Sequence, residues 1–341
     1  MASVHPLSDR GAATRHALRT ATGVTLCFLV GEYLQFRHTN LAVWTTYMVM
    51  AQHPFTNFQK GIERVVGRAL GVLAGLLIAT WLLEAPVLAI GCLTFVLLVC
   101  FYIYFAGRLS YTFLNAGLYA VVLFDIGRST PDLAPAEGAA LCFAIMLGVA
   151  VADIVDWLAG AESSLVIELG KAPLWPIRRD WLNQSLMLAV TVLVASEAAR
   201  MLELPVLDSV ISVMMLTITP DIQSLIQKGE LRVVGAILAL LYSLCMIVVM
   251  ALQPYFLLMA MMLFLGILLA AYITHAGGSY SYAGVQMGLV LPMIVVNPPE
   301  HFGSMSAVTQ RLEGIVIAMI VSLIIGSLWP RSPFRGSAPT S

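Results

Sequence analysis

A nine-residue segment that occurs twice constrains the fold of this chain more than any other feature. The segment beginning at Gln59 returns at Gln227, 168 residues further on, and the copies QKGIERVVG and QKGELRVVG agree at seven of nine positions. Each copy opens a long apolar run. Because the offset is close to half of the 341 residues, we expect two related halves with the same succession of elements.

The composition places those halves in a membrane. Hydrophobic residues make up 60% of the chain, charged residues only 11%, and the mean hydropathy is +0.89. Soluble domains carry roughly 25% charged residues, so the sequence predicts a polytopic membrane protein. No basic block indicates nucleic acid, and the five cysteines are scattered through apolar runs. The motifs HExxH, GxSxG, GxxxxGK[ST] and a GxGxxG after a strand are absent, so we expect no enzyme, metal or cofactor.

The apolar runs predict an all-α fold of about twelve transmembrane helices, since each crossing needs about 20 residues. The predicted helices are 17–36, 41–53, 62–83, 86–107, 110–125, 136–159, 181–201, 206–219, 230–252, 255–274, 280–296 and 308–329. The predicted organisation is a first six-helix repeat at 1–160, a cytoplasmic linker at 161–180, a second repeat at 181–331 and a disordered tail at 332–341.

The distribution of basic residues predicts the orientation. With the N-terminus in the cytoplasm, fourteen of the 18 Lys and Arg residues face that side, as the positive-inside rule requires. Both termini would then be cytoplasmic. Six helices separate the copies, so the two repeats would be parallel and related by a pseudo-two-fold axis along the membrane normal.

Small residues follow each copy at a spacing of four, which places them on one helix face. Such stripes let helices associate closely in lipid. The simplest assembly packs the two stripes around a shared axis, and the alternative packs each against a neighbour in its own half. The stripes are Gly67, Gly71 and Gly75 in the first half and Gly235, Ala239 and Ser243 in the second.

The second helix of each half is short and ends at Pro54 or Pro220. Short, proline-interrupted segments in matching positions point to a transporter's binding site. We therefore predict that the links 54–60 and 221–228 are broken or re-entrant and line a central pathway. The alternative is an ordinary cytoplasmic loop after a tilted helix.

Four basic residues at the repeat would then form a cationic ring at the inner mouth, which would concentrate organic anions. They are Lys60, Arg64, Lys228 and Arg232. As an alternative, they anchor the chain at lipid phosphates. Four uncharged polar residues also match between the halves, and either contact substrate or join helices. These are Tyr111, Asn115, Tyr282 and Gln286.

Proton coupling would need a group in the membrane that changes its protonation. The repeat favours Glu32 and Glu197, although local pairing with Arg37 and Arg200 is the stronger interpretation. The other candidates are His53, Asp153, Asp156, Asp221 and His275.

These motifs resemble the fusaric acid resistance or aromatic acid exporter superfamily. The resemblance rests on Arg-x-x-Gly-x-x-x-Gly at Arg64, its copy at Arg232 and Gly235, the later Tyr-x-x-x-Asn/Gln-x-Gly helix, and Arg311-Leu312-Glu313-Gly314. The chain departs from larger members in having only the 161–180 link where they carry cytoplasmic domains, and in having Arg68 where a small or apolar residue is common.

The resemblance implies proton-driven export of aromatic or other hydrophobic organic acids across a bacterial inner membrane, often with a periplasmic adaptor protein. Plant anion channels with a similar six-helix block imply a passive anion pore instead. A third hypothesis is a non-transporting scaffold that docks a partner. The expected partners are thus small organic anions, the lipid bilayer and an adaptor, and a homo-oligomer is left open.

Overall fold

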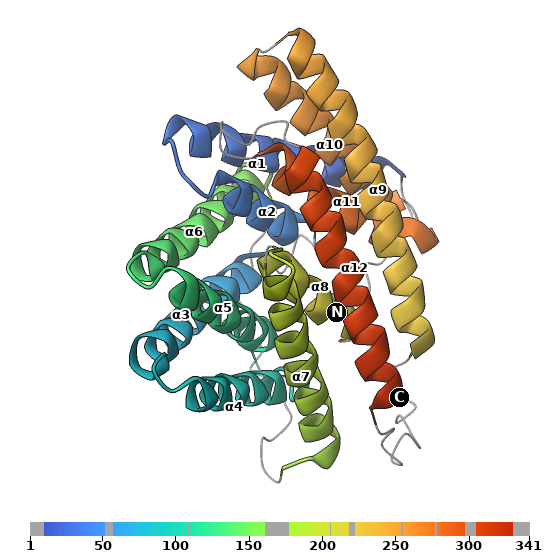
Figure 1. Ribbon diagram of the computed structural model, residues 1–341. Helices are drawn as coiled ribbons and strands as arrows, with labels where there is room; N and C mark the ends of the chain where they lie inside the picture. The colour runs from blue at the N-terminus through green and yellow to red at the C-terminus, as the bar shows by residue number, and fades with distance from the viewer. Residues whose placement is uncertain are drawn as a thin grey trace. The chain divides into compact units, whose positions relative to one another are not determined.

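The computed structural model describes residues 10–51, 57–107, 109–160, 177–204, 206–217, 222–253, 255–276, 278–296 and 305–329. Within these ranges the chain forms helices and no strand, and an α-helix stands at each of the twelve predicted places (Figure 1). The all-α class is therefore confirmed. Most of the predicted linker and the whole predicted tail lie outside these ranges.

The start of α4 coincides with a proline in the sequence. Pro86 occupies the first turn of α4, where its missing N–H costs nothing. In the first half the helices are α1 (Arg10–Tyr33), α2 (Thr39–Met50), α3 (Asn57–Leu82), α4 (Pro86–Phe105), α5 (Ser110–Ser129) and α6 (Ala134–Leu158). In the second half they are α7 (Arg179–Met201), α8 (Val206–Thr217), α9 (Ile222–Leu252), α10 (Phe256–Ala276), α11 (Ser281–Val295) and α12 (Met305–Leu328).

Seven of the described helices are long and apolar enough to cross a membrane, namely α3, α4, α5, α6, α7, α9 and α10. Helices α2 and α8 have 12 residues each, fewer than the roughly 20 that a crossing requires. The multi-pass membrane class is confirmed. The prediction of twelve transmembrane helices in two repeats stays a prediction.

Two compact units make up the described chain, and each draws on both halves of the sequence. The first unit comprises the described residues within 1–62, 139–166 and 227–312. The second comprises those within 63–138, 167–226 and 313–341. The first unit thus holds α1, α2 and most of α6, α9, α10 and α11, while the second holds most of α3 with α4, α5, α7 and α8.

Each unit contains the same ring of four packed helices. In the first unit, α1 packs against α2 and α10, and α11 packs against α10 and α2. In the second unit, α7 packs against α8 and α4, and α5 packs against α4 and α8. The two patterns coincide when each helix is matched with the one six places away in chain order.

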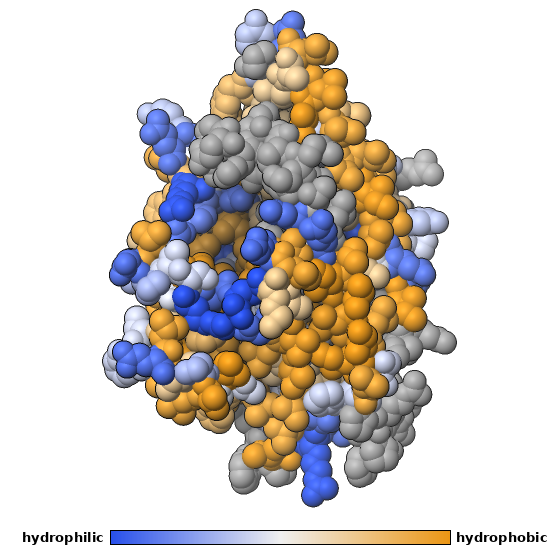
Figure 2. Space-filling view, viewed as in Figure 1, coloured by the Kyte–Doolittle hydropathy of each residue, from blue (hydrophilic) through white to orange (hydrophobic). Residues whose placement is uncertain are grey.

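Large apolar side chains remain on the surface of several long helices. Trp81, Val87 and Phe95 are 80%, 85% and 66% exposed, and orange apolar residues cover much of the face in Figure 2. In water such a surface would drive aggregation. In a bilayer it is the surface that faces the hydrocarbon chains.

Candidate transport site

The glycine stripe of α3 lies against α5 within the second unit. A Cβ atom added at Gly67 would collide with the backbone carbonyl of Thr112, and one added at Gly71 would collide with that of Ala116. Gly75 is comparably close to α5. Only glycine lets the two backbones approach to this distance.

These contacts correct the expectation that the stripe of α3 packs around an axis shared with its copy. In the first unit Gly235 of α9 lies against α11, where the Ala283 carbonyl and the Gln286 Cβ leave no room for a side chain. Ala239 and Ser243 are buried. Gly67, Gly71, Gly75 and Gly235 thus pack within their own halves, because the fifth helix of each half offers its backbone to them.

Two arginines of α3 are buried beside the crossing with α5. Arg64 is 3% exposed and Arg68 is 0% exposed. The guanidinium carbon of Arg64 lies 5.5 Å from the ring centroid of Tyr111, and that of Arg68 lies 3.8 Å from the ring centroid of Tyr119. A desolvated guanidinium gains about 2 kcal/mol or more from such a contact.

Arg68 and Tyr119 were missed as site residues by the sequence reasoning. Arg68 follows Arg64 by four residues, and Tyr119 follows Tyr111 by eight, so each pair lies on one face of its helix. This matched spacing on α3 and α5 is the signal that could have identified the second pair.

The amide of Asn115 belongs to the same group of side chains in the second unit. Its Nδ2 donates to the backbone carbonyl of Tyr111 at 2.7 Å, one turn earlier on α5. The structure therefore brings Arg64, Tyr111 and Asn115 together at the α3–α5 crossing, as a buried cation, an aromatic ring and an amide.

The first unit holds the corresponding residues on α9 and α11. Arg232 is 4% exposed and Gln286 is 0% exposed. The Tyr282 hydroxyl is buried, and among the described residues it has no hydrogen-bond partner. The crossing of α9 with α11 thus carries an arginine, a tyrosine and an amide side chain, as the crossing of α3 with α5 does, with Gln286 in the place of Asn115.

Tyr47 joins α2 to this region of the first unit. Its side chain is fully buried, and its hydroxyl donates to the Gly284 carbonyl at 3.2 Å and lies 3.3 Å from the Thr274 Oγ1. The ring occupies the place of any side chain at Gly288. This contact explains the glycine in the Tyr-x-x-x-Gln-x-Gly motif, whose Tyr47 partner lies too far away in sequence to be recognised.

The two lysines of the predicted ring lie in helices. Helix α3 begins at Asn57 and α9 at Ile222, so most of the links predicted to be re-entrant is regular helix. Lys60 and Lys228 are half-buried. His53 and Asp221 lie outside the described residues. Arg64 and Arg232 belong to different units, and the ring of four cations stays a prediction.

The predicted carboxylates have different surroundings. Glu32 is exposed and Asp153 half-buried. Glu197 accepts from Arg128 at 2.7 Å and from Arg200 at 2.6 Å, which is the local pairing expected for it, with Arg128 as an additional partner. This pairing agrees with the stronger interpretation of Glu197, and Glu197 as a proton carrier stays a prediction.

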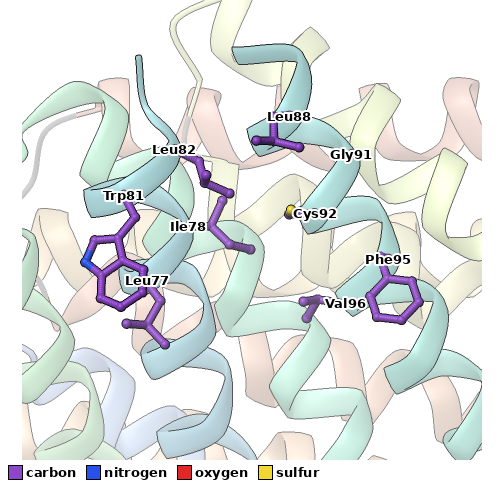
Figure 3. A pocket seen from close by; sticks show the side chains of 9 residues that line it. All are labelled: Leu77, Ile78, Trp81, Leu82, Leu88, Gly91, Cys92, Phe95 and Val96. Carbon is purple, nitrogen blue, oxygen red and sulfur yellow. The ribbon is translucent and has the colours of Figure 1, made fainter. Parts of the chain in front are cut away.

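An apolar groove lies in the second unit between the end of α3 and the start of α4. It has a volume of about 430 Å³, and Figure 3 shows apolar side chains lining it. These residues are Leu77, Ile78, Trp81, Leu82, Leu88, Gly91, Cys92, Phe95 and Val96. Apart from the Trp81 indole N–H and the Cys92 thiol, the side chains that line the groove carry no polar group.

Comparison with known proteins agrees with the membrane bundle. Residues 26–155 match the family model described as fusaric acid resistance protein-like. The chain is 28% identical over 160 residues to proteins named p-hydroxybenzoic acid efflux pump subunit AaeB, including those of Shigella boydii serotype 4 and Yersinia enterocolitica. These alignments cover 44% of this chain and 24% and 25% of those relatives. No solved structure matches the chain.

Proposed function

Because residues 26–155 match the family model described as fusaric acid resistance protein-like, we propose that this protein is a secondary exporter of aromatic or other hydrophobic organic acids, driven by protons across a bacterial inner membrane. The matched relatives are named as p-hydroxybenzoic acid efflux pump subunits. The chain spans about a quarter of their length, so its substrate and coupling are part of the proposal.

The burial of the Arg64 guanidinium is the observation that carries the proposal. A guanidinium buried in a membrane helix is costly unless it serves a site. The Arg64 side chain contacts the Tyr111 ring, and its Nε has no hydrogen-bond partner among the described residues. A carboxylate supplies the charge and the acceptor pair that a guanidinium binds best. The ring of an aromatic acid would then lie beside Tyr111.

The matching residues of the first unit support a second anion site at Arg232, with Tyr282 and Gln286. We attribute the two sites to a duplication in which α1 to α6 correspond to α7 to α12. The identical packing of four helices in the two units supports this attribution. Each unit would then combine elements from both repeats.

The test is p-hydroxybenzoate efflux from proteoliposomes. Arg64→Gln and Arg232→Gln each remove one buried cation, and the double variant is expected to abolish flux. Arg64→Lys retains the charge and should keep part of it. The control is Arg179→Gln, which removes an exposed arginine at the start of α7 and should leave flux unchanged. Wild-type flux in the double variant would contradict the assignment.

Coupling is tested on the same liposomes. An inward proton gradient should accelerate export in an exporter. Anion currents in planar bilayers that do not change with the proton gradient would instead identify a passive channel. The same buried arginines would bind anions in such a channel.

The remaining parts of the proposal concern assembly. The relatives are named as pump subunits. The word subunit supports a pump that includes at least one other protein, and we propose a periplasmic adaptor in that role. The excess of basic residues in alternate loops supports cytoplasmic termini. Cysteine labelling from each side of the membrane tests the orientation, and co-purification tests the adaptor.

A further inference from the structure

Four ionisable side chains from three helices meet in the first unit, outside the proposed anion sites. His16 and Arg19 lie in the second and third turns of α1, Asp156 in the last turn of α6, and His275 in the last turn of α10. His16, Asp156 and His275 are 8%, 6% and 4% exposed. The sequence reasoning had named Asp156 and His275 as candidates, but it missed His16 and Arg19, which are distant from them along the chain.

Arg19 bridges two of these groups. Its Nε lies 3.1 Å from the Asp156 Oδ1 in an ion pair, and its guanidinium lies 2.8 Å from the His16 Nδ1. A guanidinium can only donate, so the His16 Nδ1 accepts, and the ring proton of a neutral His16 lies on Nε2. The His16 and His275 rings meet edge to face with centroids 4.0 Å apart.

A proton at the His16 Nδ1 would change this arrangement. The proton takes the lone pair that accepts from Arg19, so that hydrogen bond is lost and two cations stand side by side. The imidazolium and the guanidinium then compete for Asp156. The cluster therefore has two arrangements, one in which Arg19 bridges α1 to α6 and one in which protonated His16 displaces it. Protonation biases the choice between them.

Among the described residues, three further titratable side chains lie within one turn of the cluster on its own helices. Asp153 lies one turn before Asp156 on α6, Arg15 is exposed on α1, and Tyr272 lies one turn before His275 on α10. Helix α2 contacts α1 at Gly23 through the uncharged Met50 and Thr46. Asp153 is the one nearby carboxylate among these groups, and it would favour the protonated form of His16.

The cluster lies at one end of the helices that form it. It combines the beginning of an odd-numbered helix with the ends of two even-numbered helices. In the topology predicted from the basic residues, all three ends are cytoplasmic. A proton-driven exporter must release protons on that side.

The second unit has aromatic rings in the corresponding place. There Trp181 of α7 meets Tyr102 of α4, with centroids 5.9 Å apart and an interplanar angle of 69°. The offset of 165 that relates Glu32 to Glu197 also relates His16 to Trp181. Neither an indole nor a phenol changes charge near neutral pH, so the interhelix ring contact occurs in both units and the titratable pair in one.

We propose that His16 and His275 form the proton-binding site of this exporter, with Arg19 and Asp156 as the ion pair that the proton rearranges. The inference rests on the proposed export function. Proton binding at His16 displaces Arg19 from the His16 Nδ1 and changes which side chain of α1 pairs with Asp156 of α6. Loss of the proton to the cytoplasm restores the pairing of Arg19 with both Asp156 and the His16 Nδ1.

The first test measures proton binding without transport. The chain has six histidines, so nitrogen NMR of histidine-labelled protein in nanodiscs can assign His16 by comparison with His16→Gln. We expect His16 to change from the Nε2-protonated tautomer to imidazolium between about pH 5 and pH 8. Arg19→Gln should move the transition to higher pH by removing a cation, and Asp156→Asn should move it to lower pH. A His16 signal unchanged across this range would overturn the proposal.

The second test separates coupling from transport. The double variant His16→Gln, His275→Gln should lose the acceleration by a proton gradient and keep exchange of p-hydroxybenzoate at equal pH. His38→Gln, at the start of α2, is the matched control and should keep both. Wild-type gradient acceleration in the double variant would refute the site. Absence of exchange in the wild-type protein would instead refute the export function, while the NMR titration would still decide whether His16 binds the proton.

Discussion

Replacing Gly71 with alanine tests the close contact of α3 with α5. The added methyl group would collide with the carbonyl oxygen of Ala116, and the Ala116 carbonyl carbon and Cα would each lie 3.0 Å away. All three atoms belong to the helix backbone, so no side chain can rotate to make room. Helix α3 must move away from α5 as a whole.

The cost follows from the size of that movement. Carbon atoms pack best at roughly 3.5–4.0 Å, so the helices must separate by about 0.5–1 Å. Overpacking of this kind costs about 1–3 kcal/mol. Alanine recovers about 1 kcal/mol of helix propensity. Because a carbonyl is displaced only together with its helix, the upper part of the range applies, and the net loss is about 1–2 kcal/mol.

Unfolding in detergent measures this loss, and Gly91 provides the control. Gly91 also lies within a helix, α4, and a Cβ added there meets no atom within 4 Å. Gly91→Ala should therefore be neutral or stabilise the protein by up to about 1 kcal/mol. If Gly71→Ala were as stable as Gly91→Ala, the close α3–α5 contact would be refuted.

Two further substitutions test contacts elsewhere in the fold. Tyr47→Phe keeps the ring and removes the hydrogen bond to the Gly284 carbonyl, which should cost about 0.5–1.5 kcal/mol in thermal unfolding; an unchanged melting temperature would contradict this contact. Glu197→Gln removes the charge that Arg128 and Arg200 share on a partly exposed side chain. It should cost at most about 1 kcal/mol and leave gradient-driven efflux at the wild-type rate, whereas loss of that efflux would identify Glu197 as a proton carrier.

The positions of the helices could be predicted from sequence because their causes are local. Apolar runs bounded by proline, glycine and charge define each helix, and the structure has a helix at each predicted place among the residues it describes. The residue types at the candidate site were also evident from the repeat, since Arg64, Tyr111 and Asn115 have counterparts in Arg232, Tyr282 and Gln286.

The partners of each helix face could not be predicted, because a stripe of small residues fits any helix that presents a close backbone. The structure packs the α3 stripe against α5, and it buries Arg64 and Arg68, which the sequence could equally place at lipid headgroups.

The sequence by itself determined a membrane chain of helices with a duplicated basic segment. The tertiary structure alone decided that each compact unit combines helices of both halves, and that His16 meets His275. The physical reason is the separation along the sequence over which each kind of signal acts. Periodicity and composition indicate whether each helix lies in lipid or in water. Contact between residues more than 250 positions apart depends instead on how all the helices pack together.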